Sequence, residues 1–163
     1  MTVRRLRPDE WPLLRALRLA ALLDAPEAFA ATLADALSST DDDWKAWAEA
    51  GSSGTDAAVF VAHDGDHPVG LVAGRREDAD VHLLSLWVVA AFRGRGHGDA
   101  LVDAVVAWAR ELAAASVSLW VVEGNEPARR RYRRAGFRPT GRTQPLPSRP
   151  ELTEERWVRP LEA

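Results

Sequence analysis

The feature that most constrains the fold is a glycine-rich stretch that separates a predicted strand from a predicted helix. Residues 93–98 read Arg-Gly-Arg-Gly-His-Gly and follow an apolar run from Val81 to Val89. Apolar residues then recur at helical spacing, at Leu101, Val105, Trp108 and Leu112. A strand, a glycine turn and a helix N-terminus predict an anion site, because backbone N–H groups and the helix dipole point to one place. We expect Arg93 and Arg95 to strengthen that site.

Two other interpretations of this stretch stay open. Glycines also occur in tight connections that need a positive φ and bind nothing. A dinucleotide site would need a parallel βαβ unit with an acidic residue after its second strand, and Glu123 does follow the apolar run Val117 to Val122. Three hairpin-like strands upstream of the glycines disfavour that alternative. A P-loop is excluded, because no Lys-Ser or Lys-Thr pair follows the glycines.

The rest of the chain predicts short strands and amphipathic helices on both sides of the glycines. Upstream we expect a strand at Val3–Leu6, a helix capped by Asp9, a helix through Trp44 and Trp47, and a hairpin of Val59–Val61 and Val69–Ala73 around Asp64-Gly65-Asp66. Downstream we expect a strand at Val117–Val122, a short helix around Tyr132, and strands at Phe137–Arg142 and Glu155–Leu161 joined by a loop with Pro145, Pro147 and Pro150. This order predicts a single α+β domain over residues 1–163, with helices packed on a mainly antiparallel sheet.

Composition narrows the possible functions. The chain has no cysteine, which excludes disulfides, thiolate metal sites and a cysteine nucleophile, and we expect no metal. The polar start and the lack of a long apolar run predict a cytoplasmic protein that binds no membrane. Five arginines crowd residues 129–134, but a net charge of −3 and a pI of about 5.8 disfavour nucleic-acid binding, which remains a weaker alternative.

A second motif lies downstream of the glycines: Asn125, Ala128, Tyr132, Gly136 and Phe137. Their spacing matches the Asn-x-x-Ala-x-x-x-Tyr-x-x-x-Gly-Phe segment of the GNAT superfamily of N-acetyltransferases. Arg93, Gly96 and Gly98 match the Gln/Arg-x-x-Gly-x-Gly/Ala pyrophosphate loop of the same family. With both motifs in order, the chain resembles this superfamily. One departure is Ala90, because many members carry a proline at this point of the bulged strand.

The resemblance implies a sheet of about seven strands that splays at its central strands, flanked by about four helices. It also implies acetyl-CoA as cosubstrate. The backbone of Trp87, Val88 and Val89 would hold the pantetheine arm as an added strand would, and Arg131 or Arg134 would meet the 3′-phosphate. The full set expected at the cofactor comprises Leu86, Trp87, Val88, Val89, Arg93, Gly94, Arg95, Gly96, His97, Gly98, Asp99, Asn125, Ala128, Arg131, Tyr132 and Arg134.

The resemblance further implies N-acetylation of a primary amine, on a small molecule or a peptide, by direct attack in a ternary complex. Tyr132 would protonate the departing thiolate, since a phenol of pKa about 10 can supply that proton; the alternative is a core aromatic residue. No carboxylate lies on the strand at residues 84–88, so Glu123, His82 or water is expected to take the proton of the amine. A non-catalytic acyl-CoA-binding module stays open as an alternative function.

Two further expectations concern the acceptor and the partner. Acidic residues at Glu77, Asp78 and Asp80 favour a cationic acceptor. An exposed terminal edge strand makes a homodimer reasonable.

Overall fold

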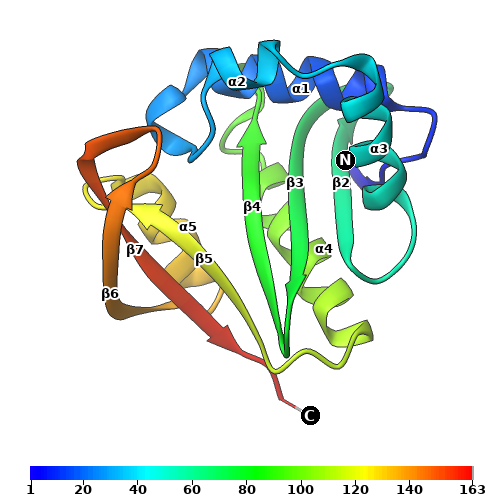
Figure 1. Cartoon of the computed structure of the whole chain (residues 1–163). Coiled ribbons are helices and arrows are strands. Elements are labelled where there is room, and N and C mark those ends of the chain that lie inside the picture. Colours follow the sequence, from blue (N-terminus) through cyan, green and yellow to red (C-terminus); the bar gives the residue numbers. More distant parts are fainter. Residues whose placement is uncertain (163) are drawn as a thin grey trace.

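One seven-stranded sheet organises residues 1–162, the part of the chain that the computed structural model describes (Figure 1). Its spatial order is β1-β2-β3-β4-β5-β7-β6, and every neighbouring pair is antiparallel except β4 and β5. The strands are β1 (Thr2–Arg5), β2 (Ala57–Asp64), β3 (His67–Glu77), β4 (Asp80–Val88), β5 (Ser116–Val122), β6 (Arg138–Leu146) and β7 (Arg149–Pro160). The predicted α+β class is confirmed.

Five α-helices and two short 3₁₀ turns complete this part of the chain. The helices are α1 (Trp11–Asp24), α2 (Leu33–Leu37), α3 (Asp41–Ser52), α4 (His97–Glu111) and α5 (Glu126–Arg134), and the turns are Pro26–Ala28 and Ala90–Phe92. The sequence predicts four helices; α2 was missed because its five residues span little more than one turn. Among the described residues, no helix is long and apolar enough to cross a membrane.

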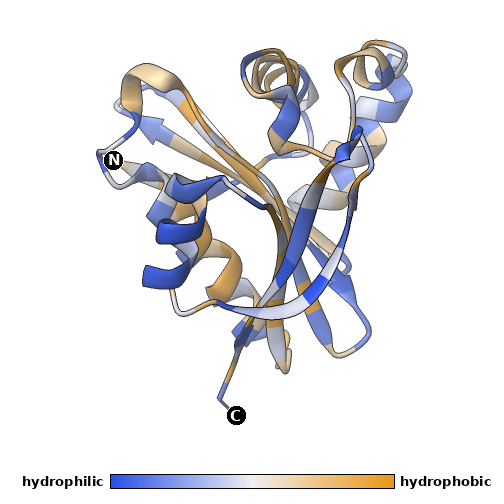
Figure 2. Cartoon of the chain, turned by 90° about the vertical axis from the view of Figure 1, so that its left-hand side faces the viewer, coloured by the Kyte–Doolittle hydropathy of each residue, from blue (hydrophilic) through white to orange (hydrophobic). Residues whose placement is uncertain are grey.

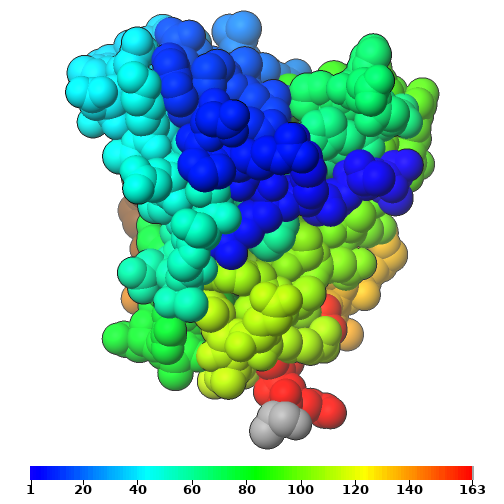
Figure 3. Space-filling model, turned by 90° about the vertical axis from the view of Figure 1, so that its right-hand side faces the viewer, coloured from blue at the N-terminus to red at the C-terminus, as the bar shows by residue number. Residues whose placement is uncertain are grey.

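Two apolar clusters bury opposite faces of the sheet. Neighbouring residues of β2 show this, because Ala58 packs in the cluster that contains α4 and Val59 in the cluster that contains α1 and α3. Burial on both faces explains the near-continuous apolar runs of β2 and β3. Figure 3 shows α1 and α3 forming the upper part of one side of the molecule and α4 the part below them. Figure 2 shows apolar residues on the central strands and the inner face of α4, whereas α5 and the β6–β7 hairpin are largely hydrophilic.

The sheet opens at its centre. β4 and β5 are paired over only three positions, ending at His82 opposite Ser118, and then part from each other (Figure 1). The partner of Leu71 is Trp87 and that of Ala73 is Leu84, so β4 carries one extra residue there. Within this bulge, Ser85 has a φ of 62°, a left-handed conformation that costs a non-glycine residue about 1–3 kcal/mol. The predicted splay at the central strands is confirmed.

Two local predictions are wrong, each for a physical reason. The N-cap of α1 is Glu10 rather than Asp9, and the Glu10 carboxylate accepts hydrogen bonds from Arg4 and from the backbone N–H of Arg7. The proline-containing segment is not a loop, because β6 runs to Leu146 and β7 starts at Arg149. β6 is an edge strand, where proline is tolerated. The homodimer expected from this edge stays a prediction.

Candidate active site

A cavity of about 320 Å³ lies where β4 and β5 separate. Its walls come from both strands, from the start of α5 and from the connection between α1 and α2. The residues that line it are Ala25, Ala28, Phe29, Leu83, Leu84, Ser85, Leu86, Trp87, Val88, Arg93, Leu119, Trp120, Val121, Val122, Asn125, Pro127, Ala128, Arg131 and Tyr132. Most of the residues expected at the pantetheine arm therefore share one cavity, although they come from separate parts of the sequence.

The glycine-rich stretch forms a second cavity of about 150 Å³ beside the first. Its lining comprises Val88, Phe92, Arg93, Gly94, Gly96, His97, Gly98, Asp99, Arg131 and Arg134. Gly96 is the N-cap of α4 with a φ of 89°, a conformation that favours glycine. A Cβ atom on Gly98 would lie 2.9 Å from Nε of Arg131, so glycine lets this side chain approach the helix start.

The charges around this second cavity are mostly compensated. Arg93 donates to the carbonyl of Val88 at 2.9 Å and to Asp24 at 2.6 Å, and Asp24 also accepts from the Trp87 indole at 3.0 Å. The pKa of Asp24 is lowered mainly by the hydrogen bond from Trp87 and also by the one from Arg93. Arg93 thus connects the end of α1 to the end of β4. Its positive charge, which was expected to act at the anion site, is compensated by Asp24.

One net positive charge remains at the start of α4. Arg131 and Arg134 lie 3.8 and 3.5 Å from the same carboxylate, that of Asp99. Two guanidinium groups thus share one carboxylate beside the first turn of the helix. Arg95 points away to Asp64, at 3.7 Å, and packs over the Phe92 ring. The uncompensated positive charge beside the glycines thus lies on α5, at Arg131 and Arg134, rather than at Arg93 and Arg95. The contact of Arg131 or Arg134 with the 3′-phosphate stays a prediction.

The end of β4 offers fewer free backbone groups than the sequence predicts. The N–H of Val89 donates to Val69 at 2.8 Å, inside the sheet, so it is not available to a ligand. The carbonyl of Val88 accepts from Arg93 and therefore faces away from β3. Because the N–H and C=O of one strand residue point to the same side, the N–H of Val88 faces the opening between β4 and β5. Val89 was expected to offer its backbone to the pantetheine arm, and this expectation is corrected. Of the backbone groups of Val88, only the N–H is available for that contact.

Tyr132 reaches the cavity from α5. Its side chain is buried, with its ring at 5.8 Å from that of Phe137 in an edge-to-face arrangement. Burial raises the pKa of Tyr132 to about 12, although the charge of Arg131 opposes the shift. The phenol is therefore protonated at neutral pH and holds a proton to give. Asn125 caps α5 by accepting from the backbone N–H of Ala128 at 3.3 Å, and both residues also line the cavity.

A third cavity, of about 300 Å³, lies on the other side of the bulge in β4. It shares six wall residues with the first: Ala28, Phe29, Leu83, Leu84, Ser85 and Trp120. The remaining lining comprises Arg18, Ala30, Ala31, Arg75, His82, Gln144, Pro147 and Glu154. The two cavities meet at the bulge, with Tyr132 on one side of the shared wall and His82 on the other.

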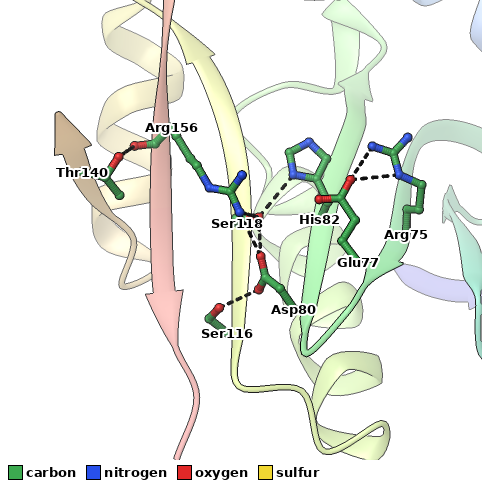
Figure 4. A network of polar contacts seen from close by, with 8 residues as sticks. All are labelled: Arg75, Glu77, Asp80, His82, Ser116, Ser118, Thr140 and Arg156. Atoms are coloured by element: carbon green, nitrogen blue, oxygen red, sulfur yellow. Dashed lines mark hydrogen bonds and ion pairs between the residues drawn. The ribbon is translucent and has the colours of Figure 1, made fainter. Parts of the chain in front are cut away.

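His82 is held in one tautomer by a buried polar network (Figure 4). Its Nδ1 lies 3.2 Å from the Ser118 hydroxyl, which donates to Asp80 at 2.7 Å and accepts from Arg156 at 3.1 Å. A hydroxyl has one hydrogen, and Ser118 gives it to Asp80, so Ser118 accepts from Nδ1–H of His82. The lone pair of His82 is then on Nε2. Burial lowers the pKa of His82 and keeps the ring neutral at physiological pH.

Glu123, the other predicted base, is not brought to the site. It is exposed in the turn after β5 and lies outside the three cavities, because the strand ends before it and its N–H bonds to Thr153. Two of the acidic residues predicted to attract a cationic acceptor are engaged. Glu77 pairs with Arg75 at 2.6 Å, and Asp80 lies in the network of Ser118 and Arg156. Asp78 is exposed and lines none of the three cavities. The cationic acceptor stays a prediction.

The sequence analysis missed three charged residues of the third cavity. Arg18 lies on α1, Arg75 on β3, and Glu154 on β7, where its carboxylate accepts from Gln144 at 2.7 Å. Burial raises the pKa of Glu154. Helical spacing gives a partial signal for Arg18, since it follows Leu17 in the stripe Leu14, Leu17 and Ala21, whereas Glu154 falls in the segment expected to be a loop. Within residues 1–162, no group of three His, Asp or Glu side chains is arranged to hold a metal ion.

Sequence relatives are N-acetyltransferases. The chain is 36% identical over 87 residues to an uncharacterized N-acetyltransferase of Methanocaldococcus jannaschii, covering 48% of this chain and 38% of the relative. It is 33% identical over 85 residues to an uncharacterized N-acetyltransferase of Mycobacterium tuberculosis, covering 52% of this chain and 54% of the relative. The matched part thus spans about half of these relatives or less.

Solved structures of similar fold cover nearly the whole chain. An acetyltransferase of the GNAT family from Streptococcus pneumoniae matches with a TM-score of 0.84 at 16% identity, over 99% of both chains. A GCN5-related N-acetyltransferase from Kribbella flavida has a TM-score of 0.78 at 26% identity, over 98% of this chain and 97% of that one. A putative acetyltransferase of Salmonella typhimurium, solved with acetyl-CoA, has a TM-score of 0.80 at 20% identity, over 100% and 95%. Because the acetyltransferase (GNAT) family profile matches residues 18–137, well over half of the sequence, this chain belongs to that family.

Proposed function

We propose that this protein is an acetyl-CoA-dependent N-acetyltransferase that acts on the primary amine of a small molecule, with direct attack in a ternary complex. The observation that carries the proposal is the meeting of two cavities at the bulge in β4. Tyr132 stands on one side with a proton to give, and His82 stands on the other with a free lone pair. An acid and a base on opposite sides of one junction suit a reaction in which an amine loses a proton and a thiolate gains one.

The residues present fit acetyl-CoA. The amides at the start of α4, with Arg131 and Arg134, would hold its phosphates, since one net positive charge is left over beside the glycines. The side chain of Asn125 would contact the pantetheine amides, and the N–H of Val88 would contact the acetyl carbonyl. Ala128 lies one helical turn before Tyr132 and lines the same wall, where its small side chain leaves room for the arm.

Acetyl-CoA, when bound, supplies a thioester carbonyl and a thiol leaving group. His82 would accept the proton of the incoming amine at Nε2, since Nδ1–H is engaged with Ser118. The N–H of Val88 would stabilise the negative charge that develops on the carbonyl oxygen. Tyr132 would give its proton to the departing sulfur as the C–N bond forms and the C–S bond breaks.

The experiment that tests this proposal measures CoA release and acetylated product across a panel of primary amines. In Tyr132→Phe, kcat should fall about 10²- to 10⁴-fold, since this is the usual contribution of a general acid. The dissociation constant for acetyl-CoA, from calorimetry, should stay within about twofold, because the ring is retained. Unchanged turnover in this variant would refute the role of Tyr132. Tight acetyl-CoA binding with no product from any amine would instead leave the chain as a non-catalytic acyl-CoA-binding module.

A further inference from the structure

The third cavity contains a buried cation without a counter-ion. Arg18 is only 8% exposed, and no hydrogen bond or ion pair of its guanidinium group occurs among the described residues. Its Nη1 is fully buried without a partner. A buried arginine is ordinarily paired, because removing a charge from water is costly unless another group compensates it. Burial lowers the pKa of Arg18 to about 10, which still leaves it charged at neutral pH.

The position of this guanidinium group is fixed by its neighbours. It stacks over the ring of Phe29, with its central carbon 5.0 Å from the ring centre. Phe29 lines both of the cavities that meet at the bulge, and its carbonyl accepts a hydrogen bond from Ser148 in the β6–β7 turn. The connection after α1 is therefore tied to the opposite end of the sheet. Arg18 thus lies in the cavity of His82, beside Phe29 of the shared wall, where the acceptor must lie if the proposed transfer reaction is correct.

The guanidinium group of Arg18 is not paired by any other charge on the acceptor side. Arg75 on the same wall is compensated by Glu77, and His82 is neutral. Glu154, also on this wall, bonds to Gln144 and does not pair with Arg18, and burial raises its pKa and so disfavours its charged form. On its far side, Arg18 also borders a separate cavity with Asp35 and Asp43, but neither carboxylate comes within ion-pair distance. Two carboxylates in that far cavity repel an anion more than the single Glu154 does, so an anionic group is favoured on the side of His82.

A carboxylate fits this position best. A guanidinium group is planar and offers parallel N–H donors that match the two oxygens of a carboxylate, and the Phe29 ring below the group restrains its position. The cavity, at about 300 Å³, has the size of a small-molecule site. We propose that the acceptor is a small amine that also carries a carboxylate, and that Arg18 binds this carboxylate while His82 takes the proton of the amine. This inference rests on the proposed transfer reaction.

The test compares acids with their uncharged counterparts. The probes are the common amino acids, β-alanine and γ-aminobutyrate, each beside its own carboxamide. Two quantities are measured with the full chain: kcat/KM from CoA release, and the dissociation constant of each probe for the CoA-saturated protein. We expect at least one acid to be preferred over its carboxamide by tenfold or more. In Arg18→Gln this preference should fall about 10- to 100-fold, the usual effect of losing a charge-assisted hydrogen-bonded pair.

Arg75→Gln is the matched control, because Arg75 lines the same cavity but is already paired. It should change the ratio of acid to carboxamide by less than about twofold, as expected for a compensated charge. Arg18→Lys keeps the positive charge but loses the paired N–H donors of the planar guanidinium group. The preference of this variant for an acid over its carboxamide should therefore lie between those of the wild type and Arg18→Gln. The melting temperature of Arg18→Gln should not fall, because this variant removes an unpaired buried charge.

The outcomes separate the two proposals. Equal acetylation of acids and carboxamides by the wild type, or an unchanged ratio in Arg18→Gln, would overturn the carboxylate site and leave the transferase standing. Binding of an acid that depends on Arg18 without any product would support the carboxylate site and refute the transfer reaction. If no probe binds and none is acetylated, both proposals fail.

Discussion

The glycine-rich loop and the acceptor cavity are built in different ways. The loop consists of consecutive residues, 93–98, and its proposed binding groups are backbone amides at the start of α4. The acceptor cavity combines side chains from α1, β4, β5 and β7, such as Arg18, His82 and Glu154, which come together only when the sheet forms. The loop should therefore tolerate most side-chain changes that spare its glycines. The cavity should be sensitive to single side chains.

Of these two regions, the acceptor cavity should show the larger effect. In His82→Gln, a side chain that can still donate to Ser118 but cannot act as a base, kcat/KM should fall about 10²-fold or more. The dissociation constant for acetyl-CoA should stay within about twofold, because His82 lies outside the two cavities assigned to the cofactor. If calorimetry showed that His82→Gln also weakens acetyl-CoA binding tenfold, the acceptor cavity and the cofactor cavities would not be independent.

The pH dependence sharpens the same assignment. The pKa of His82 is lowered by burial, below the ordinary histidine value of 6.5. A base must be unprotonated to act, so kcat/KM of the wild type should rise with pH through a midpoint below 6.5 and then level off. This acid limb should be absent in His82→Gln. A midpoint above 6.5 would argue that another group is the base.

The loop should respond to the loss of a glycine. In Gly98→Ala, the new methyl group would meet the guanidinium of Arg131 at about 2.9 Å and displace it from the cavity. We expect the dissociation constant for acetyl-CoA to rise about tenfold, the value of one charge-assisted contact, with kcat at saturation unchanged. Gly98→Ala in an Arg131→Ala background is the control. In that background, Gly98→Ala should raise the dissociation constant for acetyl-CoA only slightly further. If the effects of the two substitutions add fully in this double-mutant cycle, Arg131 is not the cause of the weaker binding.

The same contrast explains what the sequence could and could not predict. The glycine turn and Tyr132 on its helix depend on local spacing, and the sequence analysis found them. Arg18 and Glu154 depend on pairing between distant segments. Glu154 in particular stands on β7, beyond prolines that suggested a loop, and β7 is an inner strand that pairs with both β5 and β6.

Local sequence spacing also could not predict the roles of individual arginines. Arg93 matches a motif position, but its charge is taken by Asp24, which precedes it by 69 residues. The splay of the sheet was expected from the family resemblance. The position of the extra residue in β4, at Ser85, could not be predicted, because no glycine or proline marks it in the sequence. Long-range pairing decides such details, and a single sequence carries little information on it.

A smaller effect is expected at Ser118, which positions His82 without reaching the acceptor. Ser118→Ala removes the acceptor for Nδ1–H, so both tautomers of His82 become populated. We expect kcat/KM to fall about fivefold, the value of one ordinary hydrogen bond. The midpoint of the acid limb should move to lower pH, because the lost hydroxyl stabilises the charged ring more than the neutral one. Ser118→Thr keeps the hydroxyl and should restore the midpoint. A rate loss with an unmoved midpoint would indicate a packing defect only.

The smallest effect is expected at Arg95, inside the loop itself. Its side chain is 59% exposed and its nearest carboxylate, that of Asp64, lies 3.7 Å away. Exposed charges of this kind contribute little and are screened by salt. In Arg95→Gln the dissociation constant for acetyl-CoA should rise about twofold at low ionic strength and by less at 0.5 M salt, with kcat unchanged. Calorimetry at the two salt concentrations checks this. A salt-independent tenfold loss would mean that the loop binds through its side chains as well as its backbone, and the contrast with the acceptor cavity would no longer hold.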